Sequence, residues 1–192
     1  LALSLVLLSA CSHSIWNFLL KGSTNREVFI WWMLISISVL LIPVGIIMFL
    51  QEPFTTIGLL FILGTVILHI LYYILLARGY TNADLSLVYP IARGIAPILV
   101  PILGIFILNE RVSSIGLIGI LIIILGIGIV YWWGRIKEII REPLQFLREP
   151  GLRYAVGTGI IIAIYSIWDK VGVSHINPVM YMYSMTLGTA IS

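Results

Sequence analysis

Long apolar runs separated by short polar breaks limit the fold of this chain more than any other feature. Seven runs are long enough, or nearly so, to cross a bilayer as helices, which takes about 20 residues each. They cover residues 2–21, 28–50, 57–78, 85–108, 114–133, 153–171 and 177–192. Only 10% of the 192 residues are charged, against about a quarter in a soluble domain. The pattern predicts an all-α polytopic membrane protein.

A short motif occurs twice, about 152 residues apart. Ser-Ile-Trp followed by Asn or Asp stands at 14–17 and again at 166–169, each time inside an apolar run. Either this is chance, or the chain contains two similar halves. Five helices per half is an odd number, so a second half of the same fold enters the membrane upside down. We therefore expect an inverted repeat of five-helix units, with one full unit and the start of the second.

This repeat implies three parts: a first unit at 1–133, a linker at 134–152 and a truncated second unit at 153–192. The linker is highly charged, and its isoleucines and Leu144 recur at helical spacing. It is predicted to be an amphipathic segment on the membrane surface, or else a solvated charged loop. Lys and Arg gather on the linker side of the spans, which predicts a cytoplasmic linker and an outside N-terminus.

Ionisable residues inside spans are costly and mark functional sites. In the first span His13, Asn17 and Lys21 follow every four residues, with Trp16 beside them, so they share one helical stripe. The stripe is predicted to line a polar cavity. Alternatively, His13 and Asn17 hold neighbouring helices together, and Lys21 reaches for the interface.

The fourth span is the most unusual segment. Its polar and helix-bending members are Tyr89, Pro90, Arg93, Pro97 and Pro101. The prolines are predicted to bend this helix. Arg93 is a candidate contact for a carboxylate or phosphate of a substrate, because its guanidinium binds such groups through two parallel hydrogen bonds. Alternatively, Arg93 pairs with Asp84 or extends to the surface.

The sixth span carries Tyr165, Trp168 and Asp169. Asp169 is a candidate site for a cation or a proton, or else it pairs with Lys170. His69 in the third span is more simply explained as a buried, hydrogen-bonded side chain.

The sequence contains no enzyme signature. It lacks a Gly-rich phosphate loop and a His-Glu-x-x-His motif, and its three histidines have no metal-ligand spacing. Lys and Arg lie at span ends and form no basic stripe. We therefore expect no catalytic residue, no cofactor, no metal and no nucleic-acid partner.

Several motifs resemble the EamA-type transporters of the drug/metabolite transporter superfamily. They are Ser12–Lys21, Ala77–Tyr80, Tyr-Pro-x-x-Arg-Gly at 89–94, Leu108–Arg111 and Tyr165–Gly172. The resemblance implies ten helices in two inverted repeats, of which about three helices are absent here. It also implies transport of amino acids, other metabolites or drugs. Its members have both termini in the cytoplasm, which contradicts the orientation from loop charges.

The related small multidrug-resistance exporters carry a coupling carboxylate eight residues before a lysine. Here the residue eight before Lys21 is His13. Histidine titrates near neutral pH, so proton coupling stays open, but drug/proton antiport by the carboxylate mechanism is not supported.

Together these features predict a secondary transporter for a small solute, working by alternating access in the cell membrane (plasma or inner), coupled to protons or another ion. The alternatives are a lipid-carrier flippase and a non-transporting scaffold or sensor. The residues expected along the substrate path are His13, Trp16, Asn17, Tyr89, Arg93, Tyr165, Trp168 and Asp169.

Overall fold

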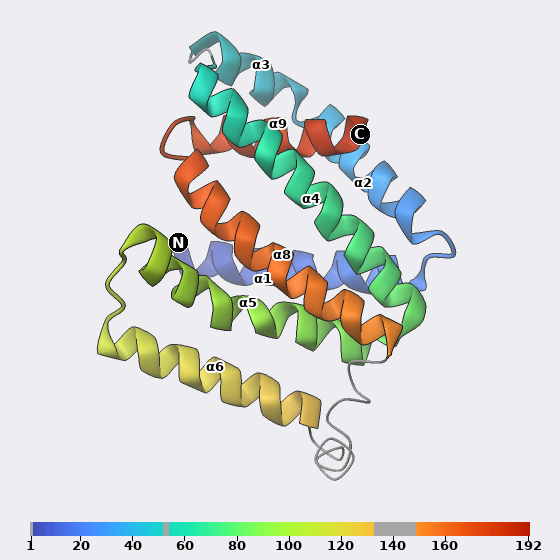
Figure 1. Cartoon of the computed structure of the whole chain (residues 1–192). Helices are drawn as coiled ribbons and strands as arrows, with labels where there is room; N and C mark the ends of the chain where they lie inside the picture. Colours follow the sequence, from blue (N-terminus) through green and yellow to red (C-terminus); the bar gives the residue numbers. More distant parts are fainter. Residues whose placement is uncertain (1, 52–53, 133–148) are drawn as a thin grey trace.

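The computed structural model describes residues 2–51, 54–132 and 149–192, and these residues are helical with no strand among them (Figure 1). The helices are α1 (Ala2–Gly22), α2 (Arg26–Leu40), α3 (Ile42–Gln51), α4 (Thr56–Asn82), α5 (Leu85–Leu108), α6 (Ser114–Trp132), α8 (Pro150–Gly172) and α9 (Pro178–Ile191). The predicted all-α class is confirmed. The inverted repeat stays a prediction.

Local sequence signals set several helix ends. Asp84 stands at the N-cap of α5 in extended backbone, although its side chain makes no capping hydrogen bond. Asn109 ends the same helix with φ 53°, the left-handed conformation that asparagine tolerates. Asn177 caps α9 by accepting a hydrogen bond from the Val179 amide at 3.0 Å. These positions agree with the predicted breaks.

The span predicted over 28–50 is not one continuous helix. α2 ends at Leu40, α3 begins at Ile42, and the two are bent by 55°. The cause is Pro43 in the first turn of α3, since proline has no N–H to donate and its ring collides with the carbonyl four residues earlier. The helix resumes once the Gly45 amide bonds to the Leu41 carbonyl at 2.9 Å.

The linker prediction falls mostly on residues 133–148, which lie outside the described residues. Its last three residues, 150–152, form the first turn of α8, so this helix begins before the predicted boundary at 153. Pro150 explains the earlier start, because its fixed φ and missing N–H suit the first position of a helix.

Helix α8 lies between α4 and α5 and packs closely along both (Figure 1). Glycines allow this approach. A Cβ built on Gly159 lies 2.9 Å from the Ala92 carbonyl oxygen of α5, and one on Gly151 lies 3.1 Å from the Ala83 amide that follows α4. Backbone atoms cannot move aside, so only glycine fits these crossings. Around this centre, α6 packs along α5, and α9 packs against α2, α3 and α4.

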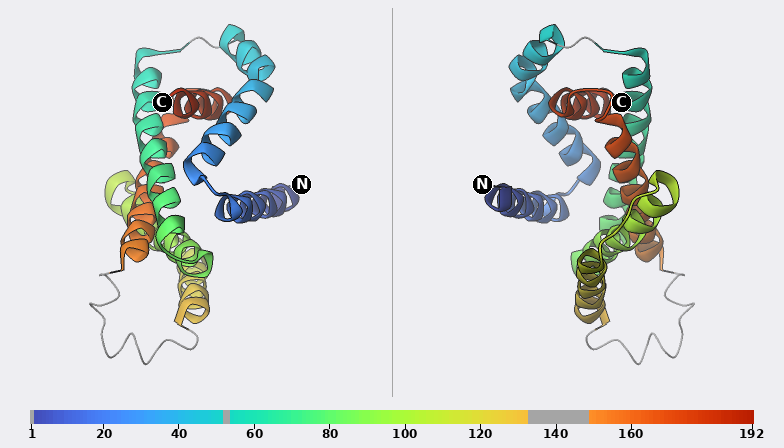
Figure 2. Two further views of the ribbon diagram at one scale, coloured as in Figure 1. Left: turned by 90° about the vertical axis from the view of Figure 1, so that its right-hand side faces the viewer. Right: turned by 90° about the vertical axis from the view of Figure 1, so that its left-hand side faces the viewer.

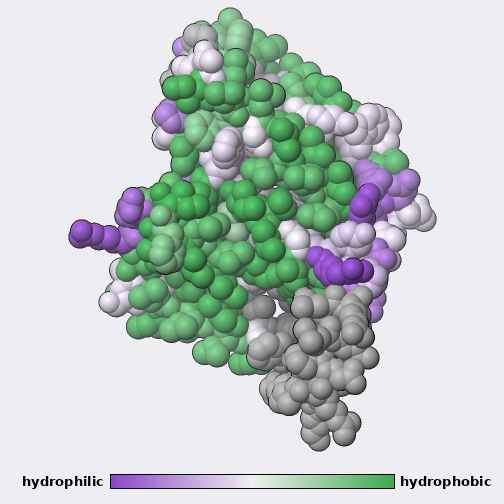
Figure 3. Space-filling view, viewed as in Figure 1, coloured by the Kyte–Doolittle hydropathy of each residue, from purple (hydrophilic) through white to green (hydrophobic). Residues whose placement is uncertain are grey.

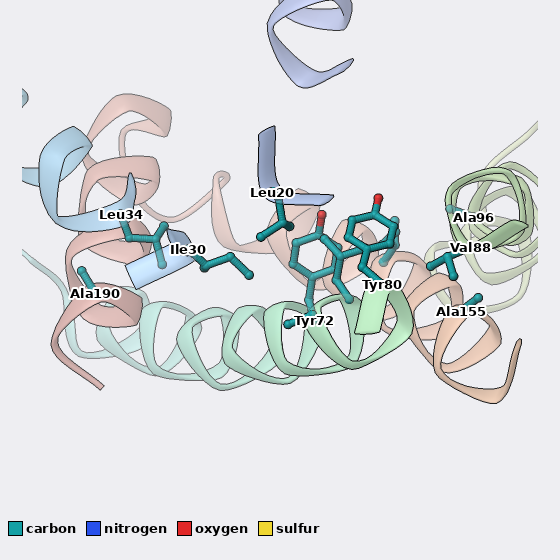
Figure 4. Packing of buried hydrophobic residues seen from close by; sticks show 12 residues of the cluster. Leu20, Ile30, Leu34, Tyr72, Tyr80, Val88, Ala96, Ala155 and Ala190 are labelled. Atoms are coloured by element: carbon teal, nitrogen blue, oxygen red, sulfur yellow. The ribbon is translucent and has the colours of Figure 1, made fainter. Parts of the chain in front are cut away.

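The buried apolar cluster joins α4 to its neighbours. Figure 4 shows Tyr72 and Tyr80 rising from α4 on the side of Leu20 in α1. The cluster consists of Leu20, Ile30, Leu34, Tyr72, Leu76, Ala77, Tyr80, Val88, Ala96, Ala155, Ile162 and Ala190. Two of its largest members therefore carry phenol hydroxyls, which need partners when they are buried.

Helix α1 stands to one side of the layer formed by α4 and α8 (Figure 2). Its apolar face is open, with Leu3 and Phe18 about 70% exposed, yet Asn17 and Leu20 are buried. Few backbone contacts join α1 to the other helices, so its polar side chains carry much of the attachment.

The exposed surface fits a bilayer. Helices α1, α4, α5 and α8 are each long and apolar enough to cross a membrane, and the bent pair α2–α3 counts as a fifth span. The face of the molecule drawn in Figure 3 is hydrophobic over its middle and has hydrophilic residues at its two sides. The chain is a multi-pass membrane protein.

Three glycines of α6 lie beside open space in the described part of the chain. Ideal Cβ atoms on Gly119, Gly126 and Gly128 meet nothing within 4 Å among the described residues. Closely packed glycines lie on other helices, among them Gly64 of α4 and Gly151 and Gly159 of α8, where helices from the two predicted units cross.

We predict that Gly159→Ala destabilises the protein by about 1–3 kcal/mol, because the added methyl group overpacks the α5–α8 crossing. Gly119→Ala is the matched control. It is expected to leave the stability unchanged or to raise it, since the same methyl group enters open space. Thermal unfolding of both variants in detergent measures the difference. Equal melting temperatures for the two variants contradict the close crossing.

Candidate functional site

Arg93 stands where α1, α4 and α5 meet. One guanidinium nitrogen, Nη2, contacts Nε2 of His13 in α1 and donates to the Tyr72 hydroxyl of α4 at 3.2 Å. Neither partner, a neutral imidazole or a phenol hydroxyl, supplies a negative charge to the guanidinium. The structure therefore brings together two of the predicted path residues, His13 and Arg93, which are 80 positions apart in the sequence.

His13 has two competing donors. Its Nε2 faces Arg93, and its Nδ1 lies 3.2 Å from Nε1 of Trp16. A neutral imidazole accepts on one nitrogen only, and a protonated ring accepts on neither. Arg93 and Trp16 therefore cannot both donate to His13 at the same time. A change of tautomer or protonation releases one of them.

Aromatic rings surround the guanidinium. Its carbon Cζ lies 6.0 Å from the ring centre of Tyr72 and 5.9 Å from that of Tyr89, at the outer limit of a cation–π interaction. Beyond Tyr72, the ring of Tyr165 stands edge-on at 5.8 Å, and Trp16 stands edge-on to Tyr73 at 6.4 Å. The charged group of Arg93 is thus surrounded mainly by aromatic side chains.

Asn17 and Lys21 attach α1 to the end of α4. The buried Asn17 amide accepts a hydrogen bond from the Tyr80 hydroxyl at 2.7 Å. The Lys21 ammonium donates to the carbonyls of Tyr80 and Ala83 at 2.9 and 2.8 Å. A cation at these free carbonyls is stabilised by the negative end of the helix dipole. Lys21 therefore holds two helices together and does not extend freely to the interface.

A second group of polar side chains surrounds Asp169. The Tyr181 hydroxyl of α9 donates to Oδ1 of Asp169 at 2.8 Å. Lys170 does not pair with Asp169, because it forms an ion pair with Glu110 beyond the end of α5. Trp168 donates to the Phe61 carbonyl at 2.9 Å, and the same carbonyl lies 3.3 Å from the Tyr181 hydroxyl. Trp168 therefore shares a contact with the Asp169 group.

His69 connects the two groups. It is buried, and its Nδ1 lies 2.9 Å from the Thr65 carbonyl one turn earlier. This agrees with the interpretation of a buried, hydrogen-bonded histidine. Its ring also stacks on Tyr165 with 4.3 Å between centres.

The three prolines lie within a continuous helix. α5 runs unbroken from Leu85 to Leu108 with Pro90, Pro97 and Pro101 inside it. Its bending during function stays a prediction.

Hollows lie between the described helices. One, of about 460 Å³, lies between α1 and α5 and is lined by Asn17, Phe18, Tyr89 and Pro90 among others. Another, of about 330 Å³, lies among α2, α4 and α9, with Glu27 and Arg78 at its polar positions.

Sequence reasoning missed Tyr80 and Tyr181 as partners of the predicted residues, and it gave Tyr72 no role. A signal for two of them was present, since His69, Tyr72, Leu76 and Tyr80 recur at helical spacing in α4. No such pattern marks Tyr181. Its contact with Asp169 depends on the turn that folds α9 back against α4.

The comparison with known families decides the identity of the chain. The model of the EamA-like transporter family matches residues 1–132. The chain belongs to the EamA-like transporter family. This match confirms the resemblance seen in the sequence, and an EamA-like membrane transporter implies a small-molecule substrate and a lipid environment. Curated proteins and solved structures gave no match.

For this EamA-like chain we predict that Asn17→Ala lowers stability by about 1–3 kcal/mol, because it leaves the Tyr80 hydroxyl buried without its acceptor. Tyr80→Phe removes that hydroxyl. A double-mutant cycle is therefore expected to show coupling of about 0.5–1.7 kcal/mol. Melting temperatures of the two single variants and the double variant measure it, and additive losses contradict the contact.

Proposed function

We propose that this protein is a secondary transporter for a small solute that carries a carboxylate or phosphate, working by alternating access in the plasma or inner membrane. The observation that carries this proposal is Arg93, a cation within a membrane bundle whose hydrogen-bonding partners are a histidine and a tyrosine. Transport is coupled to protons or another ion.

The charge of Arg93 supports an anionic ligand. Among residues 2–51, 54–132 and 149–192 the one salt bridge joins Lys170 to Glu110, so the expected alternative of an Arg93–Asp84 pair is not found there. A partly buried cation without a counter-ion is costly. A carboxylate or phosphate supplied by the substrate offsets that cost and satisfies the forked donors of the guanidinium.

The surrounding rings favour an amphipathic substrate. Tyr72, Tyr89, Trp16 and Tyr165 offer apolar faces with polar edges next to the cation. We propose that His13, Trp16, Asn17, Tyr89, Arg93 and Tyr165 line the path, with Asp169 further along it and Trp168 at its margin. The prolines of α5 supply the bending, and the two halves of an inverted repeat supply the alternating movement.

The hollow between α1 and α5 favours one second candidate, a lipid-carrier flippase. It opens at the side of the bundle beside Tyr89 and Asn17, and the exposed face of α1 is apolar. A lipid with a phosphate headgroup fits an arginine reached from the side. A soluble metabolite instead enters from the ends of the helices.

We predict that a thermal-stability screen of the full-length protein against amino acids, sugar phosphates, nucleobases and cationic drugs finds anionic ligands. A ligand that binds the folded state raises the melting temperature. Arg93→Ala is expected to weaken this binding about tenfold or more, the value of a charged hydrogen bond, and Arg93→Lys to restore part of it.

The matched control is Arg111→Ala, which removes an exposed arginine from the loop after α5 and leaves binding unchanged. Uptake of the bound ligand into proteoliposomes then separates the two candidates, since a flippase moves labelled lipid and leaves the soluble ligand outside. Equal binding by wild type and Arg93→Ala contradicts the proposed role of Arg93.

A further inference from the structure

We propose that Asp169 is the group that carries the coupling proton, and that a proton and an anionic substrate bind together, so that transport is a symport. This inference rests on the proposed function, because it takes Arg93 as the contact for the anion. The observation behind it is the separate polar group around Asp169, connected to Arg93 through aromatic side chains.

Asp169 is a partly buried carboxylate with a neutral partner. Its Oδ1 accepts from the Tyr181 hydroxyl, and Tyr181 is itself only 3% exposed. The adjacent cation, Lys170, is engaged with Glu110. Within the described parts of the chain, no Lys or Arg forms an ion pair with Asp169. A carboxylate held by a neutral hydroxyl and without an ion pair is the kind of group that transporters use in proton relays.

The oxygens near Asp169 suit a proton better than a metal ion. The Phe61 carbonyl beside it already accepts from Nε1 of Trp168 at 2.9 Å and lies 3.3 Å from the Tyr181 hydroxyl. The Phe61 carbonyl and Oδ1 of Asp169 are thus both already in contact with donors. No cluster of three His, Cys, Asp or Glu side chains suited to a metal occurs in the described residues. A proton needs only the carboxylate.

Titratable and charged groups lie on each element that packs near Asp169. They are Tyr165 and Lys170 on α8 itself, His69 on α4, Tyr181 on α9, His175 in the α8–α9 turn and Arg93 on α5. Of these, His69 is held by its own helix turn at Thr65, and His175 stacks on Phe61 at 5.3 Å. Asp169 is the one carboxylate in this group.

A chain of side-chain contacts leads from Asp169 to the proposed anion site. Tyr165 lies one turn before Asp169 on the same face of α8. It stacks on His69 and stands edge-on to Tyr72. Tyr72 in turn accepts from Arg93 at 3.2 Å.

These contacts set the sign of the proposed coupling. A negative group bound at Arg93 disfavours the ionised form of a nearby carboxylate and therefore favours its protonation. By reciprocity, protonation of Asp169 strengthens anion binding by the same factor. Ligands that strengthen each other's binding cross the membrane together, which is symport. Antiport requires the opposite sign.

The sequence repeat supplies a conservative test. Asn17, the counterpart of Asp169 in the first motif, accepts a hydrogen bond from the Tyr80 hydroxyl at 2.7 Å, as Asp169 does from Tyr181 at 2.8 Å. Asp169→Asn therefore installs a group that this fold already holds against a tyrosine. It keeps the acceptor and removes the proton site.

The first measurement needs no ligand. Infrared difference spectra of the full-length protein in lipid, taken on lowering the pH from about 8 to about 5, are expected to show a protonated carboxyl group that disappears in Asp169→Asn and persists in Lys170→Gln. Identical spectra for wild type and Asp169→Asn overturn the proton site.

The second measurement tests the coupling between anion binding and protonation. The anion is sulfate, which stays doubly charged over this pH range, and chloride at equal ionic strength is the reference. The rise in melting temperature caused by sulfate is measured in each variant, and the rise in Arg93→Ala is subtracted. The dependence of this difference on sulfate concentration gives the affinity. In wild type the affinity is expected to increase about fivefold or more from pH 8 to pH 5, while in Asp169→Asn it stays constant. His13→Gln alters a direct neighbour of Arg93 and tests whether His13 carries the pH dependence instead.

The outcomes separate the two proposals. A sulfate effect that is equal in wild type and Arg93→Ala contradicts the anion site, whatever the infrared result. A pH dependence that survives in Asp169→Asn and disappears in His13→Gln assigns the coupling to His13 and overturns this inference. An affinity that falls with falling pH overturns symport.

Discussion

The close crossing of α8 with α4 and α5 is the contact on which the rest of the structure depends. Glycine at 151 and 159 lets backbone meet backbone, and this sets α8 between two helices of the first predicted unit. Tyr165 consequently reaches His69 and Tyr72, and Asp169 reaches the space between α4 and α9. Without this approach, side chains from the two ends of the sequence share no site.

A cation inside such a bundle needs stabilisation, and the fold provides it only in part. Arg93 receives a histidine, a tyrosine hydroxyl and two ring faces, none of which carries a negative charge in its usual form. Lys21, in contrast, donates to two carbonyls at a helix end. The difference between these two cations is the physical basis for assigning Arg93 to a substrate and Lys21 to structure.

The two copies of the Ser-Ile-Trp motif show how similar segments take different tasks. Each copy places an amide or carboxylate against a tyrosine hydroxyl. Asn17 cannot ionise and serves to attach α1 to α4. Asp169 can ionise, and its neighbouring lysine is engaged elsewhere. One atom therefore separates a structural contact from a group that can carry charge.

The sequence by itself determined the helices, because apolar runs of about 20 residues with little charge have few alternatives in a membrane. It also indicated the family and selected His13, Asn17, Arg93 and Asp169, since polar residues at helical spacing stand out in an apolar segment. Pro43 carried a local signal for the α2–α3 bend that the predicted span 28–50 ignored.

Only the tertiary structure decided which of these residues meet. The His13–Arg93 contact spans 80 positions and the Lys21 contacts span about 60, and no local periodicity encodes such distances. Tyr181 was invisible because a tyrosine in an apolar helix resembles packing until its partner is known. The hydrogen bond from Trp168 to the Phe61 carbonyl was equally invisible. Helix rotation follows from packing against all neighbours at once, and packing is a property of the assembled bundle.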